Sequence, residues 1–123
     1  MAISPTGKLT THVLDTANGC PASGLTIELW QIAPDGSAHK ITSSTTNADG
    51  RTSSPLLAEG TIAIGEYELR FWVGDYFATL DPKLPDPPFL NLVPIRFSIA
   101  DTAAHYHVPL LVSPWSYSTY RGS

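Results

Sequence analysis

Residues 65 to 73 have the sequence Gly-Glu-Tyr-Glu-Leu-Arg-Phe-Trp-Val, and this stretch is the clearest indication of the fold class. Large apolar side chains alternate along it with mostly charged ones, which is the period of two expected for a β-strand with one buried face. The apolar positions are Tyr67, Leu69, Phe71 and Val73. The pattern therefore predicts a strand whose apolar side lies against a protein core.

Shorter segments with the same alternation lie on both sides of this strand. Residues 25–32 and 92–100 each place apolar side chains on one face, and residues 8–14 and 105–112 do the same. Eleven prolines and nine glycines interrupt the chain too often for long helices, although a short helix around residues 74–80 fits the sequence. We therefore predict an all-β chain, a β-sandwich of seven or eight strands with one short helix.

Turn signals separate the predicted strands. Pro-Asp-Gly at residues 34–36 predicts a hairpin that leads into a polar strand over residues 37–46. Asn-Ala-Asp-Gly at residues 47–50 predicts the next turn, with Arg51 at its exit. A last hairpin turns at residues 113–116 and returns toward the end of the sequence.

Composition excludes several classes of function. The 123 residues fit one domain over residues 1–123, and 42% hydrophobic residues supply a core. A net charge of -4 without any cluster of Lys and Arg argues against nucleic acid as a partner. No stretch approaches the ~20 apolar residues of a membrane span, and the first residues lack the apolar region of a signal peptide, so we expect a cytoplasmic protein. One cysteine excludes an intrachain disulfide and a multi-thiolate zinc site.

Three histidines occupy suggestive positions on two of the predicted strands. Alternation places His12 on the face opposite the core side of its strand, and it places His105 and His107 likewise. Leu14 and Leu111 share these outward faces, and a sheet face that mixes apolar and titratable groups is typical of a surface that docks on another subunit. The alternative is that each histidine is only a surface or interface side chain.

Two chemical interpretations of these side chains stay open at this point. Neutral imidazoles could act as acid or base near neutral pH, with Arg51 binding a planar, oxygen-rich ligand. Alternatively, His12, His105 and His107 could supply three nitrogen ligands to zinc. Arg51 could equally be an exposed loop arginine.

The motifs as a set resemble those of one family. The run Lys-Leu-Thr-Thr-His-Val-Leu-Asp at residues 8–15, His-Tyr-His-Val-Pro-Leu-Leu at 105–111, Asp-Gly-Arg at 49–51 and Tyr-Arg-Gly-Ser at 120–123 together resemble the 5-hydroxyisourate hydrolases. These are transthyretin-related enzymes of urate degradation, and the similarity covers essentially the whole chain.

The resemblance implies a transthyretin-like β-sandwich that forms a homotetramer, a dimer of dimers, with active sites at the subunit interfaces. It implies hydrolysis of 5-hydroxyisourate to 2-oxo-4-hydroxy-4-carboxy-5-ureidoimidazoline, with no cofactor and no metal. The implied catalytic residues are His12, Arg51, His107 and Ser123. The implied substrate-binding residues are Tyr120, Arg121 and Gly122.

Three other classes of function compete with this one. Transthyretin, a hormone carrier, has the implied fold but lacks the histidine pair and the Tyr-Arg-Gly-Ser ending, so a carrier of an aromatic ligand is the first alternative. A small zinc-dependent hydrolase and a purely structural sandwich are the others.

Overall fold

The structure is a computed structural model that describes residues 5–123, and it contains eight strands and one helix in that range. The strands are β1 (Lys8–Asp15), β2 (Cys20–Pro21), β3 (Thr26–Ile32), β4 (Ala38–Thr45), β5 (Gly65–Trp72), β6 (Leu92–Ile99), β7 (His105–Val112) and β8 (Tyr117–Thr119), and the helix is α1 (Val73–Leu80). This confirms the predicted all-β chain with one short helix.

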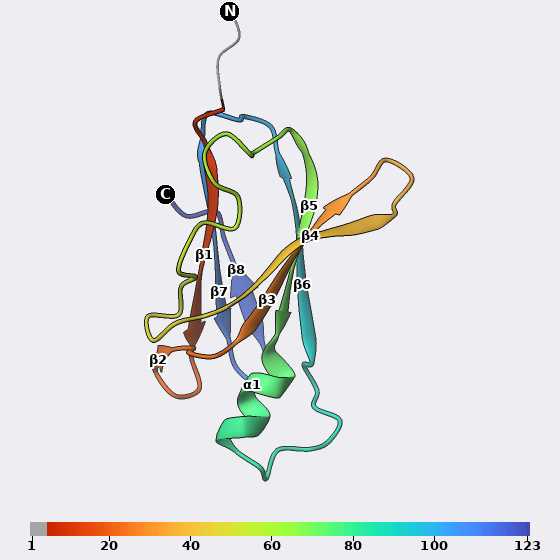
Figure 1. Cartoon of the computed structure of the whole chain (residues 1–123). Coiled ribbons are helices and arrows are strands. Elements are labelled where there is room, and N and C mark those ends of the chain that lie inside the picture. Colours follow the sequence, from red (N-terminus) through yellow and green to blue (C-terminus); the bar gives the residue numbers. More distant parts are fainter. Residues whose placement is uncertain (1–4) are drawn as a thin grey trace, which may run out of the picture.

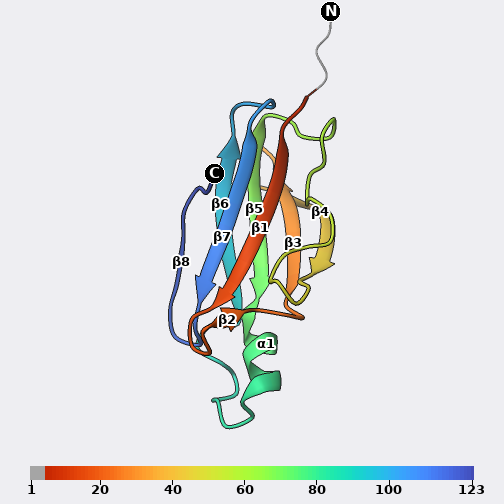
Figure 2. The same ribbon diagram turned by 90° about the vertical axis from the view of Figure 1, so that its left-hand side faces the viewer.

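Two four-stranded sheets face each other (Figure 1). One has the strand order β2-β1-β7-β8 and the other β4-β3-β5-β6. Every pairing is antiparallel except that of β1 with β7, which run side by side in the same direction. Figure 2 shows β1 and β7 as the two central strands of the first sheet, with β8 along its edge. The predicted hairpins β3–β4 and β7–β8 are both present.

The core lies between the sheets and is built from the apolar faces that the alternation predicts. On β5, Tyr67, Leu69 and Phe71 are at most 2% exposed. Leu9 of β1 and Leu110 of β7 are fully buried against them. Burying side chains of this size contributes about 1.5–3 kcal/mol each. The two sheets are therefore held together by hydrophobic burial between their inner faces, and the side chains on their outer faces are not part of this core.

Helix α1 follows β5 directly and lies at one end of the sandwich (Figure 1). Its Tyr76 hydroxyl donates a hydrogen bond of 2.8 Å to the buried Asp15 carboxylate at the end of β1. The same carboxylate accepts hydrogen bonds from the backbone N–H groups of Ala17 and Asn18. Burial and the neighbouring carboxylate together raise the pKa of Tyr76, so it stays a donor. The helix is thereby fixed to the sheet that carries the histidines. Within residues 5–123, no helix is long and apolar enough to cross a membrane.

Candidate active site

The outer faces of β1 and β7 carry the predicted histidines. Buried and accessible residues alternate strictly along β1, with His12 among the partly accessible ones. On β7, His105 is exposed and His107 is partly buried, while the residue between them is buried. The parallel register aligns Thr10 with His107 and His12 with Pro109. The outward direction predicted for all three histidines is confirmed.

A single hydroxyl group connects two of these imidazoles. The Oγ1 atom of Thr10 lies 2.7 Å from Nε2 of His105 and 2.8 Å from Nδ1 of His107. The two ring centroids are 6.1 Å apart. Because strands β1 and β7 are neighbours only through tertiary pairing, this contact joins residues that are 97 positions apart in the sequence.

Arg51 reaches the same face from the long loop that runs beside β1. The Asn47 side chain accepts hydrogen bonds from the backbone N–H groups of Asp49 and Arg51, which fixes the turn. Gly50 has φ +74°. Its N–H donates a hydrogen bond to the Asn47 carbonyl within the turn, and its carbonyl accepts a 2.8 Å hydrogen bond from the Val13 N–H of β1. A Cβ at this position would collide with the Val13 carbonyl oxygen, so both the positive φ and the close approach require glycine. The turn is thus held against β1 with Arg51 next to the imidazoles.

These side chains form a cleft of about 340 Å³. Its lining residues are Thr10, Thr11, Arg51, Thr52, Ser53, Ser54, Pro55, His105, His107 and Ser123. The end of the sequence closes one side, because the Gly122 N–H donates a 2.8 Å hydrogen bond to the His107 carbonyl. A Cβ on Gly122 would lie 2.6 Å from Cδ2 of His107, so this glycine allows the backbone to rest directly against the imidazole.

The cleft favours a neutral imidazole. Burial lowers the pKa of His107 most, and the positive charges of Arg51, His105 and His12 lower it further. No aspartate or glutamate side chain is among the lining residues to oppose this effect. At neutral pH His107 is therefore uncharged, which is the state in which a histidine can accept a proton.

The predicted site residues lie in three places in the single chain. Arg51, His107 and Ser123 line the cleft, and Gly122 contacts the His107 ring. His12 lies on the same face, near enough for its charge to affect the pKa of His107, but it does not line the cleft. The two remaining substrate-binding candidates, Tyr120 and Arg121, lie outside the cleft.

Tyr120 and Arg121 line a different hollow, between the edge strands β6 and β8. The Arg121 guanidinium carbon lies 4.2 Å from the ring centroid of Tyr106, a cation–π contact. Tyr120 is 60% exposed. In the single chain neither side chain reaches the histidine cleft, so their predicted contact with substrate has no support from this geometry.

The zinc interpretation finds no support in the geometry. No group of three or more His, Cys, Asp or Glu side chains within residues 5–123 is placed to hold a metal ion. His105 and His107 each direct a ring nitrogen at the Thr10 hydroxyl instead of at a common empty position. The histidines are arranged for hydrogen bonding.

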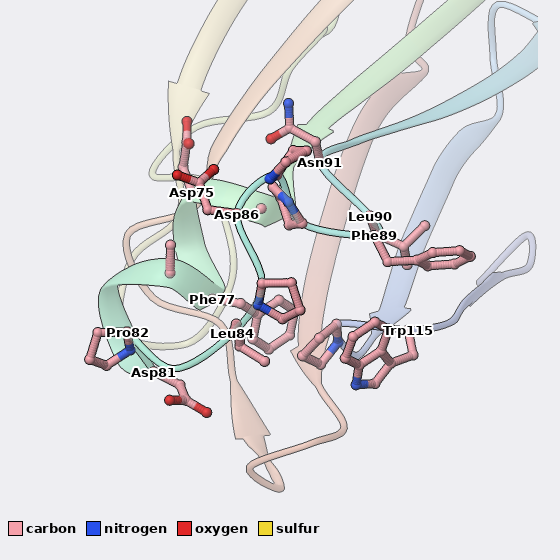
Figure 3. Close-up of a pocket in the computed structure, with 16 residues that line it drawn as sticks. Asp75, Phe77, Asp81, Pro82, Leu84, Asp86, Phe89, Leu90, Asn91 and Trp115 are labelled. Carbon is pink, nitrogen blue, oxygen red and sulfur yellow. The ribbon is translucent and has the colours of Figure 1, made fainter.

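A second hollow, of about 450 Å³, lies at the opposite end of the molecule beside α1 (Figure 3). Its walls are the proline-rich loop after α1 and apolar side chains such as Phe77 and Leu84, with Phe89 and Trp115 in contact at one side. Its only charged lining side chains are carboxylates, and it contains no histidine or arginine. It therefore lacks the acid–base groups of the cleft.

Sequence reasoning did not select Thr10 as a site residue. The available signal was its place on the outward face of residues 8–14, two positions before His12. That signal does not reveal the hydrogen-bond partners of Thr10, which are His105 and His107 on β7. The pairing of β7 with β1 cannot be predicted from the sequence around Thr10.

The two four-stranded sheets, with an imidazole cluster on the outer face of one of them, define a transthyretin-like β-sandwich. The model of the HIUase/Transthyretin family matches residues 9–122, and the chain belongs to that family. A protein of Rhizobium meliloti (strain 1021) named 5-hydroxyisourate hydrolase 2 is 57% identical over 121 residues, which are 98% of this chain and 100% of that protein.

Two solved structures extend the comparison. An (S)-allantoin synthase shares 48% identity with a TM-score of 0.91 over 98% of this chain, which spans only 45% of that larger chain. A sea bream transthyretin in complex with thyroxine shares 27% identity with a TM-score of 0.83, covering 94% of both chains. The predicted transthyretin-like fold is confirmed.

Proposed function

We propose that the chain is a 5-hydroxyisourate hydrolase, which opens its substrate by hydrolysis in the breakdown of urate. The proposal draws on the relative of that name, which is 57% identical over its whole length. The observation that carries it is the placement of the His107 imidazole and the Arg51 guanidinium in one cleft whose lining residues include no aspartate or glutamate. A base and a fixed cation on the same small cleft are the two groups that hydrolysis of a ring amide needs.

His107 acts as the general base in this mechanism. A water O–H bond breaks as its proton moves to the imidazole, and the electron pair left on oxygen forms a bond to a ring carbonyl carbon. The carbonyl electrons move to its oxygen and give an alkoxide. When the alkoxide collapses, the ring C–N bond breaks and the nitrogen takes the proton back from His107. The product is 2-oxo-4-hydroxy-4-carboxy-5-ureidoimidazoline, and no cofactor enters the reaction.

Arg51 and His12 have separate roles in this reaction. The guanidinium hydrogen-bonds a polar edge of the planar substrate and stabilises the alkoxide, and removal of one such donor typically costs about 10²–10³ in rate. His12 orients the substrate or donates a proton. The hydroxyl of Ser123 positions water or substrate, and Gly122 holds the chain end against the His107 ring. Tyr120 and Arg121 stand apart from this cleft in the single chain, so their proposed contact with substrate rests on the family resemblance alone.

We propose further that the active unit is a homotetramer, a dimer of dimers, with each site at a subunit interface. The outer face of β1 and β7 supports this, because Leu14 and Leu111 lie beside the imidazoles and are only partly covered in the single chain. In such an assembly a second copy would cover the cleft and exclude bulk water.

The deciding experiment mixes the protein with freshly generated 5-hydroxyisourate and follows the decay of its absorbance. We expect decay much faster than the spontaneous reaction, unchanged by a strong chelator, and lost in a His107→Ala variant. Binding of substrate without faster decay would instead indicate a carrier, the function suggested by the thyroxine complex of the sea bream transthyretin. Activity that disappears with the chelator would indicate a metal-dependent hydrolase.

A further inference from the structure

The hydroxyl of Thr10 has one proton and stands between two imidazole nitrogens. It lies 2.7 Å from Nε2 of His105 and 2.8 Å from Nδ1 of His107, so both contacts are hydrogen bonds. A hydroxyl can donate to only one of the two nitrogens, and it must accept from the other. The protonation of one ring therefore determines that of the other.

Only two neutral arrangements satisfy this geometry. In the first, Thr10 donates to Nε2 of His105 and accepts from the Nδ1–H of His107. In the second, Thr10 donates to Nδ1 of His107 and accepts from the Nε2–H of His105. A neutral imidazole carries one proton, so the first arrangement leaves a lone pair on Nε2 of His107 and the second leaves a proton there.

The Nε2 atom of His107 is the ring atom that is free to meet substrate. Within residues 5–123 this nitrogen has no hydrogen-bond partner, because the bond to Thr10 is made by Nδ1. In the same range, every side-chain nitrogen or oxygen that is shielded from solvent has a partner, unless its residue is an exposed one. The atom is therefore accessible, and His107 lines the cleft. Whether it can accept a proton from water depends on which arrangement is present.

The charges around the pair favour the first arrangement. Arg51 shares the cleft with His107, and a lone pair directed into that cleft is more favourable beside a cation than an N–H group. His105 is exposed, so its other ring nitrogen can keep a proton and donate it to water.

We propose that Thr10, with His105 behind it, is a positioning residue that holds neutral His107 in the tautomer with its proton on Nδ1. The lone pair of Nε2 then faces the cleft, ready to accept a proton. The consequence for catalysis rests on the proposed function, but the tautomer itself does not.

The first test measures the tautomer without any substrate. Protein labelled with ¹⁵N-histidine is examined by long-range ¹H–¹⁵N correlation at about pH 8, above the ordinary histidine pKa of about 6.5. The four histidines are assigned with single His→Ala variants. We expect His107 to carry its proton on Nδ1, and a proton on Nε2 would overturn the proposal.

Three variants then test the roles of the hydroxyl and of His105. Thr10→Val keeps the shape and removes the hydroxyl, and Thr10→Ser keeps the hydroxyl. His105→Ala removes the acceptor, so the Thr10 hydroxyl becomes free to donate to Nδ1 of His107. We expect Thr10→Val and His105→Ala to move His107 toward the tautomer with its proton on Nε2, and Thr10→Ser to keep the wild-type signal. His39→Ala, on strand β4 of the other sheet, is the matched control without effect.

Kinetics provide the second readout. We expect kcat to fall by on the order of tenfold in Thr10→Val and His105→Ala, with KM little changed and with rescue in Thr10→Ser. Equal loss in Thr10→Ser and Thr10→Val would make the side chain structural and overturn the proposal. If Thr10→Val does not fold, the wild-type and His105→Ala spectra still decide. If the wild-type protein does not hydrolyse 5-hydroxyisourate, the proposed function fails while the spectra still test the tautomer.

Discussion

The outer faces of the two sheets both carry charged side chains, but only one face pairs its positive charges with carboxylates. On the sheet β4-β3-β5-β6, the Glu68 carboxylate lies between two guanidiniums, with 2.6 Å to Nε of Arg70 and 3.1 Å to Nη2 of Arg96. Nearby, Glu28 accepts hydrogen bonds from the indole N–H groups of Trp30 and Trp72. Each carboxylate has its donors, and the negative charge of Glu68 is paired with two positive charges.

The outer face of β1 and β7 has no such balance. Its cleft contains Arg51, His105 and His107 and no aspartate or glutamate side chain. The positive charges therefore act on each other, and they lower the pKa of His107 in addition to the larger effect of burial. Charged side chains on the sheet β4-β3-β5-β6 thus pair with one another, whereas those around the cleft disfavour the charged form of His107.

The largest effect is expected when the cleft loses its base. His107→Ala should reduce turnover of 5-hydroxyisourate by about 10²-fold or more, because general-base catalysis contributes that much. The side chain is only partly buried and lies outside the core, so circular dichroism and the unfolding midpoint should change little. Wild-type turnover in this variant would refute the assignment.

Removal of the cation should have the next largest effect. Arg51→Gln is expected to lower kcat/KM by about 10²-fold, since a donor to the developing negative charge is lost. It should also raise the pKa of His107 toward its ordinary value, because Arg51 is one cause of the lowering.

The pH profile checks the sign of that change. A histidine with a lowered pKa stays neutral at lower pH, so the base form is present above the ordinary value and is lost as pH falls through the lowered one. The acid limb of the kcat/KM profile should therefore move to higher pH in Arg51→Gln. Lys83→Gln, which removes the same charge from the exposed loop after α1, is the matched control and should leave the limb in place.

A smaller effect is expected from the glycine that rests on the imidazole. Gly122→Ala places a methyl group 2.6 Å from Cδ2 of His107, so the ring or the chain end must move. We expect turnover to fall roughly tenfold, because catalytic groups act only in the correct position. Gly36→Ala is the control for a local backbone cost far from the cleft: its Cβ would meet no atom within 4 Å, its φ of +88° makes alanine strained there, and it lies in a hairpin of the other sheet. Equal activity in both variants would show that contact with Gly122 does not position His107.

Local patterns were sufficient to predict most of the fold. Alternation located β5, β6 and β7 within one residue, and the Pro-Asp-Gly turn gave the β3–β4 hairpin. Helix α1 begins at Val73, one residue before the predicted start, because it continues directly from β5. These features depend on neighbours in the sequence, where side-chain period and turn residues act directly.

The candidate site could be predicted only in part. The outward direction of His12 and His107 follows from alternation, but their distance from each other depends on the parallel pairing of β1 with β7. That pairing joins the two ends of the sequence, and no local pattern specifies it. The role of Thr10 is invisible without it, since its two hydrogen-bond partners both come from β7.

The opposite face gives the smallest expected change in activity and the clearest contrast. Glu68 is 7% exposed, and although burial alone would raise its pKa, the hydrogen bonds and charges of Arg70 and Arg96 outweigh burial and lower it. Glu68→Gln leaves Arg70 without its carboxylate and leaves Arg96 with only the longer 3.6 Å pair to Glu66, which should cost about 1–3 kcal/mol of unfolding free energy. Urea unfolding at fixed protein concentration measures this loss, with Glu59→Gln at an exposed position as the control.

The pH dependence of that stability difference follows from the pKa of Glu68. Because the folded-state pKa is lowered, the difference should be present above the ordinary glutamate pKa of about 4.3 and disappear as pH falls through the lowered value. Turnover should stay at the wild-type level, since Glu68 lies on the sheet that does not carry the cleft. A variant that loses activity and keeps its stability would reverse the roles assigned to the two faces.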